Sequence, residues 1–206
     1  MDSTLNISAL IMAAGLSSRM QGNNKLLLDW KGKPILHHTI KNIVSAGFRE
    51  VLLVVGNHEK EIRKIADVFK EEINILFNPY FESGLTSSIQ CGIQAASDQT
   101  KGFMICLGDM FLINQIEFKQ LAQFHITQEL NDQVITLPKV GQKIGNPVIF
   151  AECYREQILK NSDTQGCKFI VQANAAKVKY FESLSKHFLT DLDTLEDYEQ
   201  LKKSAL

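Results

Sequence analysis

The chain has 206 residues, enough for one sizeable domain, and its 45% hydrophobic and 22% charged content is ordinary for a soluble globular protein. The formal net charge of −1 excludes a global attraction to nucleic acids or anionic membranes, so local cations must hold any charged substrate. No apolar run could span a bilayer and no secretory signal is visible, so we expect a cytoplasmic protein without a membrane or nucleic-acid partner.

Apolar runs alternate with amphipathic stretches over the first two thirds of the chain. Short runs rich in Val, Ile and Leu predict buried strands over 7–13, 51–55, 73–77, 103–107 and 134–137. Helical spacing of apolar residues predicts helices over 35–46, 58–69, 87–96 and 116–127. This alternation predicts an α/β fold of three layers, Rossmann-like, with a mostly parallel sheet and helices on both faces.

The last third is less regular. It predicts strands over 147–150 and 178–181 and helices over 154–160, 168–173 and 194–202. Thr194 is the expected N-cap of the last helix, with Asp197 completing a loose capping box. Because no linker or composition shift divides the chain, we expect a single domain over 1–206.

A loop of small residues follows the first predicted strand. Small side chains let backbone N–H groups approach an anion, and Arg19 and Lys25 can add charge to phosphate oxygens. The loop matches neither the Walker loop nor the dinucleotide fingerprint, and an ordinary surface loop with solvated cations is the alternative. The candidate nucleotide-binding residues of this loop are Ala13, Ala14, Gly15, Ser17, Arg19 and Lys25.

The string at 11–20, together with 25–27 and 32–36, resembles the opening of the MobA-like nucleotidyltransferases, and most of all their molybdenum cofactor cytidylyltransferase branch. Ala13-Ala14-Gly15 resembles the cytidylyl branch rather than the Ala-Gly-Gly form of the guanylyl branch. The resemblance implies CTP as the donor, Mg²⁺ as the cofactor, molybdopterin as the phosphate-bearing acceptor and a molybdoenzyme as a partner.

Gly108 and Asp109 directly follow the predicted strand 103–107. Since ligands gather at the carboxyl ends of parallel strands, Asp109 is placed to bind Mg²⁺, which prefers one or two carboxylates. The alternative is a turn aspartate that caps the helix starting near Asn114. The segment resembles the family's Gly-Asp-Met-Pro motif, with Phe111 in place of the proline, and this resemblance implies that Asp109 is a metal ligand and that Gly108 lies at the nucleotide.

A second acidic cluster starts at Asp191 and resembles the family's Asp-x-Asp-Thr-Pro-Glu-Asp motif, with Leu195 in place of the proline. The resemblance implies that Asp193 is the second metal ligand, with Asp191 in support. The alternative is a helix N-terminus enriched in acids, which accounts for Glu196 and Asp197 better than for the two earlier aspartates.

The segment from Gly84 to Gly92 begins with a glycine and three hydroxyl residues, so its helix start offers N–H donors to an anion or a nucleobase. It resembles the family's Gly-x-x-x-Ser-x-x-x-Gly element beside the nucleotide, which implies a nucleotide-binding role for Ser88. A plain N-cap without a ligand is the alternative.

Two segments resemble family elements on the acceptor side. Asn146 stands where the family has the histidine of Gly-His-Pro-Val, and 162–168 is a degraded Gly-Asp-x-Gly-Ala-Arg in which Gly166 is kept and Lys168 replaces the arginine. The acceptor-side candidates are therefore Asn146, Gly166 and Lys168. The five histidines and four cysteines show no metal-ligand spacing, and we interpret them as structural.

The sequence thus predicts a Mg²⁺-dependent nucleotidyltransferase in which Arg19, Lys25 and Asp109 act on the triphosphate. One alternative is a sugar-phosphate or other nucleotidyltransferase with the same fold. Another is a nucleotide-binding chaperone that inserts a cofactor into a partner without catalysis.

Overall fold

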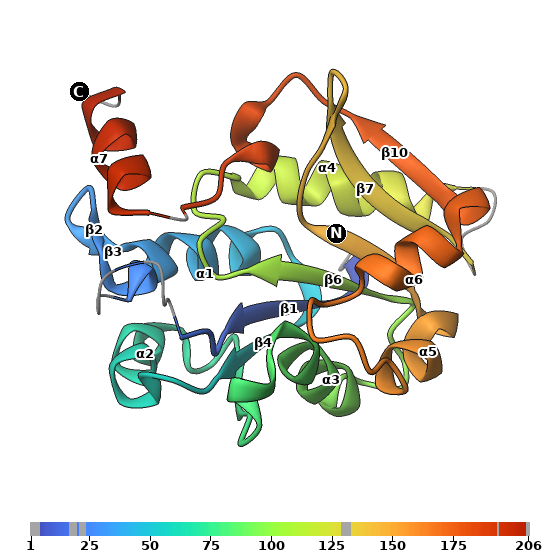
Figure 1. The fold of residues 1–206 in the computed structure, drawn as a ribbon, viewed down its shortest axis with the longest axis horizontal. Coiled ribbons are helices and arrows are strands. Elements are labelled where there is room, and N and C mark those ends of the chain that lie inside the picture. Colours follow the sequence, from blue (N-terminus) through green and yellow to red (C-terminus); the bar gives the residue numbers. More distant parts are fainter. Residues whose placement is uncertain (1–4, 17–19, 21–23, 129–132, 193, 205–206) are drawn as a thin grey trace.

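A computed structural model of the chain describes residues 5–16, 20, 24–128, 133–192 and 194–204. An eight-stranded sheet lies at its centre, in the order β10-β7-β9-β6-β1-β4-β5, with β8 paired to β7 (Figure 1). The strands of this sheet are β1 (Leu5–Ala13), β4 (Phe48–Val55), β5 (Asn74–Phe77), β6 (Gly102–Leu107), β7 (Ile135–Val140), β8 (Lys143–Ile144), β9 (Val148–Ala151) and β10 (Val178–Glu182). Two further short strands, β2 (Asp29–Trp30) and β3 (Lys33–Pro34), pair with each other.

The half of the sheet that carries the candidate site is parallel. β1 pairs in parallel with both β4 and β6, and β4 does so with β5. β9 runs antiparallel to β6 and β7, which makes the sheet mixed at that position. Met12 and Leu107 lie opposite each other in the β1–β6 register, so the two strands end side by side.

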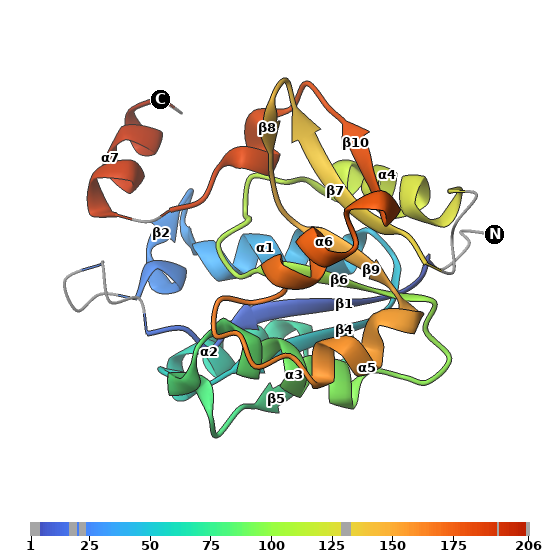
Figure 2. The same cartoon turned by 45° about the vertical axis from the view of Figure 1, so that its right-hand side comes forward.

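Helices cover both faces of the sheet (Figures 1 and 2). They are α1 (Ile35–Ser45), α2 (Glu59–Ala66), α3 (Leu85–Ala95), α4 (Gln115–Ile126), α5 (Arg155–Leu159), α6 (Lys168–Ala173) and α7 (Leu195–Ser204). The side chains of β1 alternate between two cores: Ile11 packs with residues of α1, α2 and α4, whereas Leu10 packs with residues of α3, α5 and α6. The α/β fold with a mostly parallel sheet and helices on both faces is therefore confirmed.

A third, smaller apolar cluster lies beside the sheet, where α7 approaches the β2–β3 hairpin (Figure 1). It contains Trp30, Ile35, Phe111, Leu192 and Tyr198. The rings of Trp30 and Phe111 meet edge to face at 5.0 Å, and the Tyr198 hydroxyl donates to the Asp29 carbonyl over 2.5 Å. This cluster joins three segments that are far apart in the sequence.

The predicted strands and helices are all present within a few residues of their predicted limits. The predicted helix 58–69 is divided into α2 and a 3₁₀ turn, Asp67–Phe69. The sequence analysis missed the β2–β3 hairpin and β8, because strands of two residues are too short to show a period. Within the described residues, no helix is long and apolar enough to cross a membrane.

Candidate active site

Asp109 lies at the carboxyl end of β6, beside the end of β1. The backbone N–H of Gly108 donates to the Met12 carbonyl over 3.0 Å, and the Thr39 hydroxyl donates to the Gly108 carbonyl over 2.8 Å. A Cβ at position 108 would lie 3.1 Å from both the Met12 carbonyl and the Leu26 side chain. The glycine therefore lets the chain leave the sheet closely packed and directs Asp109 to the end of the parallel strands.

The Asp109 carboxylate is buried, with 1% of its surface exposed, and it does not cap α4. Asn114 caps that helix instead, in a capping box with Glu117. Asp109 Oδ2 lies 2.5 Å from Lys25 Nζ and accepts from the Leu192 N–H over 3.4 Å. The turn-cap alternative for Asp109 is thus excluded, and the carboxylate is held by a cation and a backbone donor.

Lys25 reaches Asp109 from a 3₁₀ turn, Lys25–Leu27, that follows the small-residue loop. The Asn24 side chain accepts from the Leu26 N–H over 3.0 Å, and the Leu26 side chain is buried. Lys25 Nζ also donates to the Leu192 carbonyl over 2.8 Å. The ammonium therefore links the Asp109 loop to Leu192, which lies within the second acidic cluster.

Leu192 brings that acidic cluster to Asp109. Its side chain is buried in the third apolar cluster, and its peptide groups bond to Asp109 and Lys25. Asp193, the predicted second metal ligand, lies outside the described residues. Thr194 and Asp197 bond reciprocally, over 2.8 Å from the Thr194 N–H and 3.1 Å from the Asp197 N–H, so the loose capping box is confirmed.

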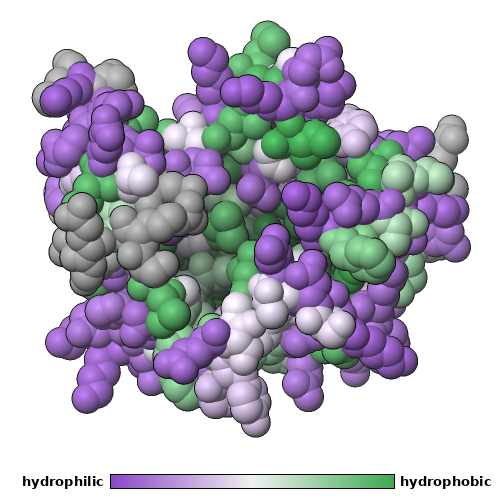
Figure 3. Space-filling model, viewed as in Figure 1, coloured by the Kyte–Doolittle hydropathy of each residue, from purple (hydrophilic) through white to green (hydrophobic). Residues whose placement is uncertain are grey.

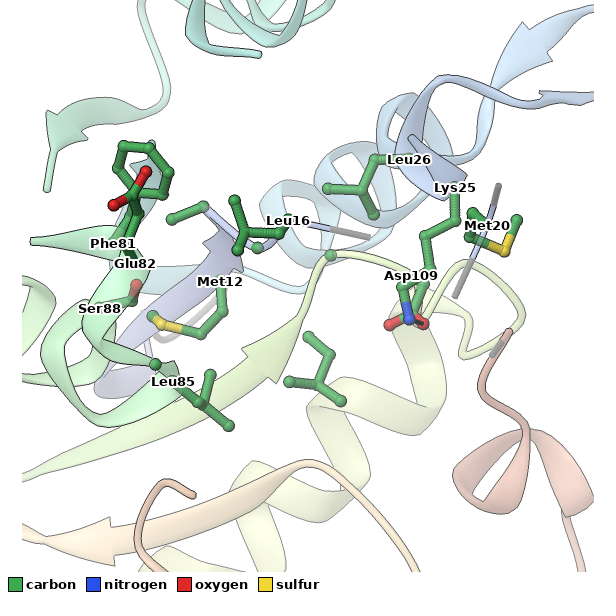
Figure 4. Close-up of a pocket in the computed structure, with 15 residues that line it drawn as sticks. Met12, Leu16, Met20, Lys25, Leu26, Phe81, Glu82, Leu85, Ser88 and Asp109 are labelled. Carbon is green, nitrogen blue, oxygen red and sulfur yellow. Dashed lines mark ion pairs between the residues drawn. The ribbon is translucent and has the colours of Figure 1, made fainter. Parts of the chain in front are cut away.

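A cavity of about 300 Å³ opens beside the Lys25–Asp109 pair. Figure 4 shows this pair at one side of the cavity and Phe81, Glu82 and Ser88 at the other. Figure 3 shows a hollow with apolar atoms in its floor on this face of the molecule. The predicted nucleotide-binding residues that line the cavity are Ala14, Gly15, Lys25, Ser88, Gly108 and Asp109.

Three of the predicted loop residues are not among the described residues that line the cavity, for two different reasons. Ala13 has a buried side chain in the core, at the last position of β1. Ser17 and Arg19 lie outside the described residues. The predicted residues that do line the cavity come from the loop after β1, from Lys25, from the loop after β6 and from the start of α3.

The start of α3 forms the opposite wall. Gly84 adopts φ 103° and ψ −175°, a region open essentially to glycine alone. Ser88 is 4% exposed and accepts from the Asn78 side-chain amide over 3.1 Å. The Thr86 hydroxyl accepts from the Gly166 N–H over 2.9 Å, so the loop before α6 rests on this helix start.

The sequence between residues 9 and 178 matches the family described as the MobA-like NTP transferase domain, which covers most of the chain. The chain belongs to this family. It is 28% identical to the molybdenum cofactor cytidylyltransferase of Escherichia coli K12 over 193 residues, which are 93% of each protein. A mannose-1-phosphate guanylyltransferase catalytic subunit beta from Drosophila pseudoobscura is 31% identical over 126 residues, with 57% of this chain and 33% of that protein covered.

The fold is also that of a solved nucleotidyl transferase from Methanothermobacter, with a TM-score of 0.82 and 19% identity over 96% of each chain. A likeness at this identity supports the fold alone. The family match is what makes this protein a member of a nucleotidyltransferase family whose donors are nucleoside triphosphates.

A second cavity of about 360 Å³ lies between the loop after β8 and the segment 187–191 of this MobA-like NTP transferase. Asn146 lines this cavity, as do Lys143, His187 and Asp191. Met110, which directly follows Asp109, also lines this second cavity, so the cavity borders the loop that carries Asp109.

The three predicted acceptor-side residues do not all meet. Gly166 bonds to Thr86 at the start of α3, and Lys168 begins α6 with an exposed side chain. Neither residue lines the second cavity, whereas Asn146 does. The structure therefore brings the 162–168 segment to the nucleotide-side helix rather than to Asn146.

A His187–Glu117 pair at the second cavity had no counterpart in the sequence analysis. His187 Nδ1 lies 3.0 Å from both Glu117 carboxylate oxygens. Burial raises the pKa of Glu117, but hydrogen bonds from Ser185, Asn114 and His187 outweigh it and hold that pKa below its ordinary value. No motif links two residues that are 70 positions apart, so only the fold could reveal this pair.

Within the described residues, no three His, Cys, Asp or Glu side chains form a ready metal cluster. Asp109 is nevertheless a suitable single ligand, because a carboxylate accepts more bonds than the two that Lys25 and Leu192 make to Oδ2. An oxygen-only donor set of this kind suits Mg²⁺, which takes few protein carboxylates and completes its shell with phosphate and water.

Proposed function

We propose that this protein transfers a cytidylyl group from CTP to the phosphate of molybdopterin and releases pyrophosphate. The observation that carries the proposal is the meeting of Asp109, Lys25 and the Leu192 backbone beside a cavity lined by Ala14 and Gly15. The similarity to the Escherichia coli molybdenum cofactor cytidylyltransferase over 93% of both chains supports this choice of donor and acceptor.

The triphosphate would lie across the cavity, with the backbone of Ala14 and Gly15 and the Lys25 ammonium at its phosphate oxygens. An acceptor phosphate oxygen attacks the α-phosphorus, the new O–P bond forms, and the bond from the α-phosphorus to pyrophosphate breaks in line with it. Lys25 and, from the sequence analysis, Arg19 offset the charge that builds on the departing pyrophosphate.

Asp109 would hold the Mg²⁺ ion, together with Asp193, which follows Leu192 directly. When bound, Mg²⁺ would offset negative charge on the phosphates and on the leaving pyrophosphate. The protein's own contribution is to fix the carboxylate: Leu192 N–H and Lys25 hold Oδ2 in place before any ligand arrives.

A pyrophosphate-release assay with a matrix of donors and acceptors tests the proposal. We expect release with CTP and molybdopterin in the presence of Mg²⁺, and at least about 10-fold slower release with GTP, because hydrogen-bonding groups that fit one base are left unpaired by the other. Release that requires GTP, or that proceeds with CTP only on another acceptor, would contradict it.

A sugar phosphate is the second candidate acceptor, and one observation favours it: the 31% identity to the mannose-1-phosphate guanylyltransferase subunit over 126 residues. This chain spans only 33% of that protein. Mannose 1-phosphate, glucose 1-phosphate and N-acetylglucosamine 1-phosphate belong in the same assay. Turnover of one of them, with none of molybdopterin, would assign this function instead.

A further inference from the structure

The ion pair between Lys25 and Asp109 holds a buried carboxylate. Nζ and Oδ2 are 2.5 Å apart, and the Asp109 side chain is 1% exposed, whereas the Lys25 side chain is 23% exposed (Figure 4). A carboxylate with so little access to water requires a partner that compensates its lost hydration. The ammonium therefore fills the place of a counter-cation at this carboxylate.

A divalent cation on this oxygen would compete with the ammonium. A Mg²⁺ ion binds oxygen at about 2.1 Å, so with Nζ 2.5 Å from Oδ2 the two cations would be at most about 4.6 Å apart. Like charges at that distance repel strongly where little water screens them. The Leu192 N–H, at 3.4 Å, occupies another direction of approach to the same oxygen.

The ammonium group of Lys25 can move while the Lys25 backbone stays in place. Its backbone belongs to a 3₁₀ turn that the Asn24 side chain caps and that the buried Leu26 side chain anchors. Its four-carbon stem is flexible, and the side chain lines the cavity. A polyphosphate in that cavity offers the ammonium several anionic oxygens that can replace its contacts with Asp109 and the Leu192 carbonyl.

We propose that Lys25 blocks the cation position on Asp109 until a nucleoside triphosphate draws the ammonium onto its phosphates. Nucleotide and divalent cation then bind as a linked pair, and by reciprocity each tightens the binding of the other. This inference rests on the proposed function, because it assumes that Asp109 is a cation ligand and that the cavity takes a triphosphate. It gives Lys25 a second role, which is to keep the empty site free of metal.

Binding of Mn²⁺, followed by the loss of its free electron paramagnetic resonance signal, tests the proposal without turnover. In nucleotide-free protein we expect Lys25→Met to bind Mn²⁺ about 10-fold more tightly than the wild type, since the competing ammonium is gone. Lys101→Met is the matched control: Lys101 is exposed and directly precedes β6, whereas Asp109 follows the other end of that strand, and the charge change is the same. Adding Asp109→Asn to Lys25→Met should abolish the gain.

The proposal is overturned if nucleotide-free Lys25→Met binds Mn²⁺ no more tightly than the wild type and the Lys101→Met control. Lys25→Gln, which is also uncharged, provides the same comparison if the methionine variant does not fold. A CTP analogue that cannot be cleaved between the α- and β-phosphates distinguishes a failure of the linkage from a failure of the proposed function. Wild-type protein that binds this analogue with Mn²⁺, without a gain in the variants, refutes the linkage alone; wild-type protein that binds neither refutes the proposed function as well.

Discussion

One side chain and one backbone N–H, a long way apart in the sequence, reach the same carboxylate in this protein. Lys25 comes from the loop after β1, and Leu192 comes from the segment before α7, yet both contact Oδ2 of Asp109. The third apolar cluster explains this convergence, because it buries the Leu192 side chain together with Trp30 and Tyr198. Burial of the apolar Leu192 side chain thus positions the backbone N–H of the same residue, which bonds to Asp109.

Replacing Asp109 by asparagine tests the chemistry of that carboxylate. We expect the rate of pyrophosphate release to fall by at least about 100-fold, because the variant keeps the shape of the side chain but loses its charge. Thermal unfolding should shift little, since Lys25 is partly exposed and can be solvated. Asp98→Asn, an exposed aspartate in the loop after α3, serves as the control. Unchanged turnover in Asp109→Asn would refute its role.

The elements that frame the cavity depend on close approaches of backbone. The start of α3 lies against the loop before α6, because Gly84 has no Cβ: an added Cβ would lie 2.6 Å from the Thr164 carbonyl oxygen. The Thr86–Gly166 hydrogen bond fixes the same contact. This contact gives the degraded 162–168 segment a structural function at the nucleotide-side helix, whatever the acceptor.

Gly84→Ala should therefore destabilise the protein by about 3 kcal/mol, through both backbone strain and the clash with Thr164. Gly141→Ala is the matched control: its φ is also positive, at +60°, but an added Cβ would meet nothing within 4 Å, so the expected loss is about 1 kcal/mol. Urea unfolding of the two variants measures the difference. Equal losses would show that the approach of Thr164 does not matter.

The whole molecule is held by two cores on opposite faces of the sheet, and one polar side chain makes the core on the α4 face sensitive to pH. His125 is 3% exposed on α4, and its Nδ1 lies 2.9 Å from the Thr136 hydroxyl. Among the described residues, its Nε2 has no hydrogen-bond partner. Burial lowers the pKa of His125 to about 4 from an ordinary value of 6.5.

The sign of the resulting pH dependence follows from these two pKa values. Between pH 6.5 and about 4 the unfolded chain binds a proton at His125 that the folded protein does not, so the free energy of unfolding falls as the pH falls. The loss attributable to His125 should reach about 2 kcal/mol at pH 5. His125→Asn should lose about that much less than the wild type between pH 7.5 and pH 5, as measured by urea unfolding. Parallel curves would contradict the prediction.

The order of strands and helices could be predicted from the sequence, because each buried strand is apolar on both faces and each covering helix is apolar on one face. The alternation in β1 and the spacing in α1 report directly which atoms avoid water. The antiparallel placement of β9 between β6 and β7 was not readable, since strand order depends on contacts between distant segments. The same limit hid the His187–Glu117 pair and the separation of Asn146 from Gly166.

The amino-acid sequence by itself determined the α/β layering and the candidate residues at the strand ends, because local periodicity and small-residue loops are encoded over a few positions. Only the tertiary structure decided that Asp109 faces Lys25 and Leu192 instead of capping α4. Trp30, Phe111 and Tyr198 pack together with Leu192, and such contacts between distant segments cannot be predicted from local sequence.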